Sequence, residues 1–243
     1  MKDKILERIT ISLDDADIVD KLAVMPAKDF QSLLLYVFER RVQPWTLIDL
    51  TKQYSENRFV EPCNISQRDL VFFDYQAFRV LSLEYEGIEL SPLAPFGTNS
   101  VLAGTDQKNV MTTVRNIEII ADPSTALALE CASRRSELIA LGLEADNDIK
   151  LATSQRNVRL QNFKKIPGFQ SHFRIFALAS AGQGDRFEQI VMGEHMAFYL
   201  VLLQTLGENG YHMEDITLFV SDIRIAEKVI RQFCLDRNEI GKE

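Results

Sequence analysis

Residues 150–184 read KLATSQRNVRLQNFKKIPGFQSHFRIFALASAGQG and contain no Asp or Glu. Besides His172, they hold six basic residues: Lys150, Arg156, Arg159, Lys164, Lys165 and Arg174. The whole chain has a net charge of -8, so it carries -14 outside this stretch, once these six positive charges are set aside. A local reversal of charge in an acidic protein indicates a site for an anionic ligand. The alternative is that the basic side chains protect an exposed sheet edge from aggregation.

The same stretch has the pattern of a β-hairpin. An alternating run extends to about Leu160, a polar loop contains Pro167 and Gly168, and an apolar run begins at Phe173. Alternation is typical of a half-buried strand, and the Pro-Gly pair is typical of a turn. We therefore expect two antiparallel strands that carry the basic residues near the connecting loop.

The composition is that of a soluble globular protein, with 243 residues, 46% of them apolar and 26% charged. The acidic balance argues against a protein that coats nucleic acid through its net charge. Cys63, Cys131 and Cys234 are far apart and odd in number, so we expect free thiols in a reducing cytoplasm and no zinc site. The N-terminus lacks a signal-like apolar core, and no apolar run approaches about 18 residues, so we expect no membrane span.

Residues 1–60 are predicted to form a helical segment separate from the remainder, 61–243. Between Lys28 and Arg40, apolar residues recur at helical spacing and form one stripe: Phe30, Leu33, Leu34, Val37 and Phe38. A shorter helical pattern, Leu47 to Tyr54, follows Pro44. These helices either pack as a bundle on the main sheet or bind a partner protein.

The remainder alternates helices and short strands without regular βαβ spacing. We therefore predict an α+β fold with a mainly antiparallel sheet flanked by helices. The expected elements are a helix over 70–85, an extended segment over 88–95, short strands over 97–120, a helix from Asp122 to about Gly142, the basic hairpin, a helix over 187–206, a strand over 215–220 and a last helix from Asp222.

Common catalytic motifs are absent from the sequence. It contains no GxxxxGK[ST] or GxGxxG element, no GxSxG elbow and no HExxH. Its histidines are His172, His195 and His212, so no histidine metal cluster is expected. We expect His195 to be a core histidine rather than a ligand.

The order of elements from about residue 70 to 230 resembles the catalytic core of class II aminoacyl-tRNA synthetases. The likeness is to histidyl-tRNA synthetase and its non-catalytic relative, the regulatory subunit of ATP phosphoribosyltransferase. The helix over 70–85 with the segment Ile88-Glu89-Leu90-Ser91-Pro92 is similar to motif 1, which implies a homodimer interface there. The turn Asp122-Pro123-Ser124-Thr125-Ala126 is similar to the family's substrate-recognition turn.

The basic hairpin resembles motif 2 of that family. Its first half is matched by Asn157-Val158-Arg159-Leu160-Gln161, and its second half by His172-Phe173-Arg174-Ile175-Phe176. The resemblance implies that Arg159 binds the α-phosphate of ATP and an amino-acid carboxylate. It also implies that His172 lies near the triphosphate and that Phe176 stacks on adenine. A charged guanidinium fork suits phosphate, and a flat ring suits a base.

The chain departs from the family pattern at several positions. Gln161 stands where motif 2 has Glu, and Pro123 or Ser124 stands where histidyl-type enzymes have an acidic residue. Glu130 replaces an Arg, which reverses a charge near a phosphate site. No motif 3 and no anticodon-binding domain follow in this sequence. We therefore expect that the chain does not charge tRNA, since adenylate formation depends on positioned cations.

Three functions remain open at this stage. The first is a cytoplasmic, dimeric binding or regulatory protein that holds a nucleotide, an amino acid or a protein partner, with ATP and Mg²⁺ as the one cofactor to consider. Its pocket would consist of Arg159, Gln161, His172, Arg174, Phe176 and Thr125. The second is an adenylate-forming ligase for a small carboxylic or amino acid, completed by another chain. The third is a module that binds RNA through the basic hairpin.

Overall fold

The computed structural model describes residues 2–143, 147–161, 169–213, 216, 217 and 219. The chain forms two compact units, Met1–Leu202 and Leu203–Glu243. Several sequence predictions lie outside the described residues: the loop with Lys164, Lys165 and Pro167-Gly168, half of the strand over 215–220, and the last helix from Asp222. The described residues 216, 217 and 219 are not in a strand.

Residues 2–56 form four helices, as the sequence predicts for this segment: α1 (Lys2–Leu13), α2 (Ile18–Ala23), α3 (Ala27–Val42) and α4 (Leu47–Glu56). Thr46 and Asp49 form a capping box that starts α4, because each side chain accepts the backbone N–H of the other. No residue of α2, α3 or α4 is buried. The domain boundary at residue 60 and the choice between bundle and partner-binding helices stay predictions.

Helix α5 (Gln67–Val80) confirms the predicted helix but ends five residues before Tyr85. Ser66 caps its start through the backbone N–H of Asp69, and Leu81 leaves the helix with an extended backbone. The turn that follows buries Tyr85. Two short strands come next, β1 (Glu86–Gly87) and β2 (Leu93–Pro95).

Residues 97–120 contain one of the predicted short strands, but the first part of the range is helical. They form helix α6 (Thr98–Ala103), the 3-10 turn η1 (Gln107–Asn109) and strand β3 (Ile117–Ile119), which pairs with β2 antiparallel. The buried carboxylate of Glu118 accepts hydrogen bonds from the backbone N–H groups of Gly97 and Asn99 and from the side chains of Asn99 and Gln107. This polar anchor, which hydrophobic periodicity does not reveal, holds the start of α6.

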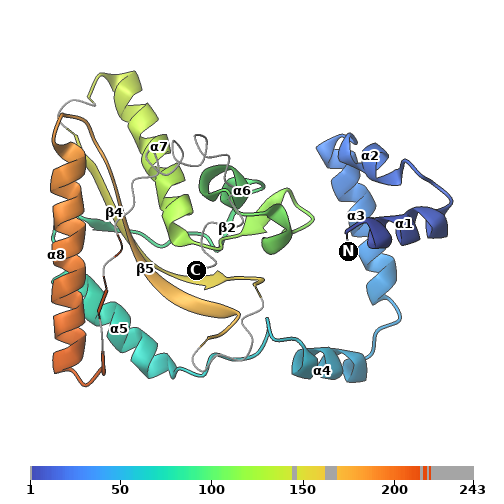
Figure 1. The fold of residues 1–243 in the computed structure, drawn as a ribbon, viewed down its shortest axis with the longest axis horizontal. Coiled ribbons are helices and arrows are strands. Elements are labelled where there is room, and N and C mark those ends of the chain that lie inside the picture. Colours follow the sequence, from blue (N-terminus) through green and yellow to red (C-terminus); the bar gives the residue numbers. More distant parts are fainter. Residues whose placement is uncertain (1, 144–146, 162–168, 214–215, 218, 220–243) are drawn as a thin grey trace. The chain divides into compact units, whose positions relative to one another are not determined.

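The main sheet has the order β1-β4-β5, built around β4 (Ile149–Val158) and β5 (His172–Ala181). These two strands pair antiparallel over their full length, which confirms the predicted hairpin, and β1 joins β4 in parallel. Helix α7 (Pro123–Leu141) starts at its cap Asp122 and ends at Gly142, whose φ of 68° is left-handed. Figure 1 shows the hairpin between the helices, and the α+β class is confirmed with one parallel pairing.

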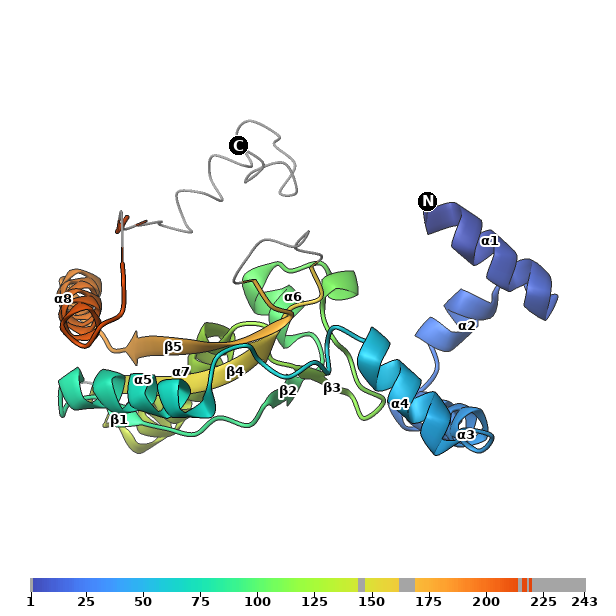
Figure 2. The ribbon, with the colours of Figure 1, turned by 90° about the horizontal axis from the view of Figure 1, so that it is seen from below.

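The two faces of the hairpin, which Figure 2 shows in a second view, contact different helices. Paired residues on neighbouring strands share a face, and successive residues alternate between faces. The face with Ile149, Leu151 and Ala177 packs on Leu127 and Cys131 of α7, and we call it the α7 face. The opposite face, called the α5 face, holds Ser154, Arg156, His172, Arg174 and Phe176.

Helix α8 (Phe187–Glu208) runs beside the hairpin and continues two residues past the predicted end. Its Phe198 stacks on Phe176 with ring centroids 5.3 Å apart. By length and composition it is apolar enough to cross a membrane, with a mean hydropathy of 1.3. The core helix of a soluble protein meets the same criterion, and the absence of a membrane role stays a prediction.

Candidate functional site

Arg159 follows the last residue of β4, and its backbone N–H extends the pairing by donating to the carbonyl of Ser171. Its Nε donates to the carbonyl of Ala121 and its Nη2 to the carboxylate of Asp122, each at 3.3 Å. These contacts aim the guanidinium toward the start of α7. Within the described part of the chain, Nη1 of Arg159 has no hydrogen-bond partner. The guanidinium of Arg159 is therefore held in place, and its Nη1 is still able to donate hydrogen bonds to an anion.

Phe173 and Thr125 lie on the same side as Arg159. The guanidinium carbon of Arg159 is 5.1 Å from the centroid of the Phe173 ring, a cation–π distance. The Thr125 hydroxyl donates to the carbonyl of Asp122, and the side chain is buried in the first turn of α7. The structure thus brings two predicted site residues, Arg159 and Thr125, to one region.

Three polar residues of β4 lie on the α7 face in a row: Thr153, Gln155 and Asn157. They are 0%, 5% and 0% exposed, respectively. In the described structure their side-chain oxygens have no hydrogen-bond partner, although Asn157 donates its amide N–H to the carbonyl of Gln155. Nearly all buried polar atoms in proteins are paired, and leaving one unpaired costs about 1–3 kcal/mol. A row of unsatisfied acceptors beside Arg159 is suited to a ligand that brings N–H donors.

The α5 face carries the other predicted cation, Arg174, in a paired arrangement. Its Nη1 donates to Asp74 of α5 at 2.7 Å, and the Ser154 hydroxyl donates to the other carboxylate oxygen of Asp74. Both charged side chains are mostly shielded from water. This ion pair joins α5 to the hairpin, so the described contacts of Arg174 are structural.

His172 is also held on the α5 face. Arg156 lies 2.8 Å from its Nδ1, and the carbonyl of Glu61 lies 2.6 Å from its Nε2. An arginine only donates, so Nδ1 must accept, and Nε2 is the nitrogen that carries a proton and donates to Glu61. His172 therefore connects the hairpin to the segment before α5.

Phe176 lies in the hydrophobic core and is 6% exposed. Its ring contacts Phe78 edge-on at 5.1 Å and stacks on Phe198. Gln161, in contrast, is exposed, and its backbone carbonyl accepts a hydrogen bond from Arg58.

The predicted single pocket of six residues needs correction, because the sheet separates its members. Arg159 and Thr125 lie toward α7, whereas His172, Arg174 and Phe176 lie on the α5 face. The reason is strand register: Phe173 pairs with Asn157, and this places Phe173, not Phe176, beside Arg159. Binding of a ligand by each predicted residue stays a prediction.

Sequence reasoning missed Gln155, Asn157 and Asp122 as site residues. The two-residue spacing of Gln155, Asn157 and Arg159 was visible, and it indicates a shared face. The part of the chain that the structure describes contains no group of three His, Cys, Asp or Glu side chains arranged to hold a metal ion. The chemistry of the α7 face therefore rests on the Arg159 guanidinium with its partner Asp122, the Phe173 ring and neutral acceptors.

No family model and no curated protein matches this chain. The solved structures that are similar to it include two with a TM-score of 0.42 each. An ATP phosphoribosyltransferase regulatory subunit/histidyl-tRNA synthetase from Bacillus halodurans C has 15% identity, and the match covers 58% of this chain and 37% of that one. PylSc, a pyrrolysyl tRNA synthetase from Desulfitobacterium hafniense, has 11% identity, with 74% and 55% covered. The chain thus spans about two fifths and just over half of these proteins, and both have class II synthetase-like folds.

Proposed function

We propose that this chain is a non-canonical class II synthetase-like protein that binds a small ligand on the α7 face and acts in a regulatory role. The ligand carries an anionic group and an N–H donor, as an amino acid or a nucleotide does. The observation that carries the proposal is that Arg159 contacts Phe173, which pairs with Asn157, on the same face of the hairpin as the unsatisfied oxygens of Asn157 and Gln155. Of the motif 2-like residues, Arg159 lies in this region, whereas His172, Arg174 and Phe176 lie on the α5 face.

The three parts of the site suit the three parts of such a ligand. Nη1 of Arg159, which has no hydrogen-bond partner among the described residues, would bind a carboxylate or phosphate, since charge-assisted hydrogen bonds are about twice as strong as neutral ones. The acceptors of Gln155 and Asn157 would take an ammonium or an adenine amino group. The exposed part of the Phe173 ring would contact the apolar or aromatic portion.

The charge balance favours a singly charged anionic group. Asp122 already offsets part of the charge of Arg159 at 3.3 Å. The resemblance expects an Arg at position 130, but Glu130 stands there, so the second expected cation is missing. Glu130 instead forms an ion pair with Arg134 at 2.7 Å. A carboxylate or a monophosphate therefore fits better than the triphosphate of ATP with Mg²⁺, and tRNA charging is not part of the proposed function.

A ligand screen on two matched variants tests the proposal. Thermal unfolding would be measured with AMP, ATP and each of the twenty amino acids for wild type, Arg159→Ala and Arg156→Ala. Arg156 is the control because it lies on the same strand but on the α5 face. We expect a ligand that raises the Tm of wild type and Arg156→Ala but not of Arg159→Ala. Absence of any shift at millimolar ligand, or an equal shift in both variants, would count against binding on the α7 face.

Two further measurements address catalysis and assembly. Amino-acid-dependent pyrophosphate exchange by the purified chain would show adenylate formation and would overturn the regulatory reading. Sedimentation equilibrium tests the homodimer that the motif 1-like element implies. A monomer at all concentrations would remove the dimer from the proposal without affecting the ligand site.

A further inference from the structure

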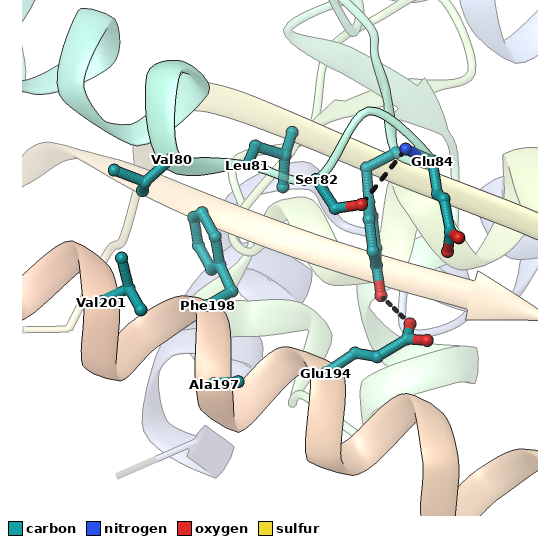
Figure 3. A pocket seen from close by; sticks show the side chains of 9 residues that line it. Val80, Leu81, Ser82, Glu84, Glu194, Ala197, Phe198 and Val201 are labelled. Atoms are coloured by element: carbon teal, nitrogen blue, oxygen red, sulfur yellow. Dashed lines mark hydrogen bonds between the residues drawn. The ribbon is translucent and has the colours of Figure 1, made fainter.

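A separate pocket of about 410 Å³ lies between the C-terminal end of α5, the turn that follows it and α8. It lies on the side of the sheet away from Arg159, because its walls contact the α5 face through Phe198 and Tyr85. The volume falls within the range of about 300–1,000 Å³ that is usual for small-molecule sites. Figure 3 shows its two different ends, one with carboxylates and one with apolar side chains.

The polar end is a network of Tyr85, Glu194, Lys150 and Glu84. The Tyr85 hydroxyl donates to Glu194 at 3.1 Å and accepts from Ser180 at 3.3 Å. Lys150 donates to Glu84 at 2.7 Å and to Glu194 at 2.9 Å. The network is anchored on three elements, so the two carboxylates are held close together before any ligand arrives.

This end of the pocket carries an excess of one negative charge. Two carboxylates, Glu84 and Glu194, share the single cation Lys150. The hydrogen bond from Lys150 holds the pKa of Glu194 below its usual value, and burial lowers the pKa of the neighbouring His195. Both effects keep the cluster negative near neutral pH, with Glu194 ionised and His195 uncharged.

Glu194 also has unused acceptor capacity. A carboxylate accepts about four hydrogen bonds. Tyr85 and Lys150 supply two of these to Glu194. An ammonium group at the mouth of the pocket would add to this network without displacing Lys150.

The other end of the pocket is apolar. Val80 and Leu81 project from the end of α5, opposite Phe198 and Val201 of α8 (Figure 3). Leaving such side chains open to water is unfavourable by about 25 cal/mol per Å² of apolar surface. A ligand with a hydrophobic body would cover them.

We infer that this pocket binds a small organic amine. Its ammonium group donates to Glu194 and Glu84, and its hydrophobic body lies against Val80, Phe198 and Val201. The site is distinct from the proposed ligand site on the α7 face and does not depend on it.

The test uses 2-phenylethylamine as the probe, with 2-phenylethanol as its neutral analogue. Binding would be followed on the full chain by ¹H–¹⁵N and methyl NMR titration. We expect shifts at Val80, Ala197 and Val201, and at least tenfold weaker binding of the alcohol. Glu194→Gln, which keeps an acceptor for Tyr85, should weaken the amine at least fivefold. Glu137→Gln, an exposed carboxylate of α7, is the matched control and should leave binding unchanged.

A second variant, Ala197→Leu, fills the pocket without changing charge and should also abolish the amine-induced shifts. Equal affinity for amine and alcohol, or equal effects of Glu194→Gln and Glu137→Gln, would overturn the proposal. Shifts confined to residues elsewhere would overturn it as well. So would concentration-dependent self-association that covers Val80 and Val201, since a second copy would then occupy the pocket.

Discussion

The two faces of the β4–β5 hairpin differ in how many of their polar atoms are paired, although Arg174 on the α5 face has a buried unpaired Nε and Arg159 on the α7 face contacts Asp122. On the α5 face each cation has a protein partner: Arg174 has Asp74, Lys150 has Glu84 and Glu194, and Arg156 has His172. On the α7 face, Gln155 and Asn157 keep unsatisfied oxygens, and Arg159 keeps a free donor group within the described structure.

Positive charge alone therefore does not locate a binding site in this protein. The α5 face has more basic residues, yet their hydrogen bonds are used to join α5 and the preceding segment to the sheet. The α7 face has fewer charges but more unused hydrogen-bonding capacity. Unpaired buried groups are costly, so their retention favours the α7 face as the place for a ligand.

The largest expected effect separates the two phenylalanines of β5. Phe176→Ala should lower the free energy of unfolding by about 3–5 kcal/mol, because it removes a buried ring between Phe78 and Phe198. Phe173→Ala should cost clearly less, since Phe173 is only partly buried, and should instead remove ligand stabilisation. Urea unfolding with and without AMP measures both effects. Equal losses of stability in the two variants would contradict the assignment of Phe176 to the core.

A second test concerns Glu118, a buried carboxylate whose four hydrogen bonds satisfy it completely. Burial by itself would raise the pKa of Glu118, but the bonds from Asn99, Gln107 and Gly97 outweigh it and lower the pKa. Glu118→Gln should therefore cost about 1.5–3 kcal/mol at pH 7, the range for hydrogen bonds to charged groups.

The pH dependence of that cost follows from the lowered pKa. The stability that Glu118 contributes is complete above its unfolded-state pKa of about 4.3, and it is lost as pH falls through the lower folded-state pKa. Urea unfolding of wild type and Glu118→Gln between pH 7 and pH 3 should show the difference shrinking below about pH 4. A difference that stays constant with pH would mean that the variant acts through packing alone.

A third test weakens the α5 face. Asp74→Asn removes the charge that Arg174 and Ser154 contact, and both ion-pair partners are mostly shielded from water. We expect a loss of about 1–2 kcal/mol, more than for an exposed ion pair and less than for a fully buried one. Glu137→Gln, at an exposed position of α7, should stay within about 0.5 kcal/mol of wild type. Ligand binding on the α7 face should persist in Asp74→Asn.

Periodicity and capping signals were enough to predict the helices α3, α4, α5, α7 and α8 and the pairing of β4 with β5. These signals failed over residues 97–109, where strands were expected and α6 and a 3-10 turn form, whereas β3 at Ile117–Ile119 agrees with the prediction. There the buried Glu118 binds two backbone N–H groups at the start of α6. A single long-range polar contact of this kind decides local structure and leaves no periodic trace.

The residues of the candidate site were predicted less well than the fold, because the sequence does not reveal the register in which β4 and β5 pair. The sequence indicates that Arg159 lies near the hairpin loop, but the loop length alone does not fix which residues of β5 lie opposite β4. Since neighbouring residues alternate faces, a shift of one residue would turn Phe173 away from Arg159 and bring His172, Arg174 and Phe176 to the face of Arg159. The pairing of Asn157 with Phe173 settles the choice, and no local pattern would have done so.

The smallest expected changes in stability come from two adjacent hydroxyl residues that lie on opposite faces of the hairpin. Thr153 is fully buried on the α7 face with an unpartnered hydroxyl, so Thr153→Val keeps the shape and removes an unsatisfied polar group. It should leave stability unchanged or raise it by up to about 1 kcal/mol. Ser154→Ala, on the α5 face, removes the hydrogen bond to Asp74 and should cost about 1 kcal/mol. Chemical unfolding of both variants measures whether the free energy of unfolding rises or falls in each. A loss in Thr153→Val as large as that in Ser154→Ala would mean that a buried water pairs the Thr153 hydroxyl, and the contrast between the faces would then rest on Gln155 and Asn157.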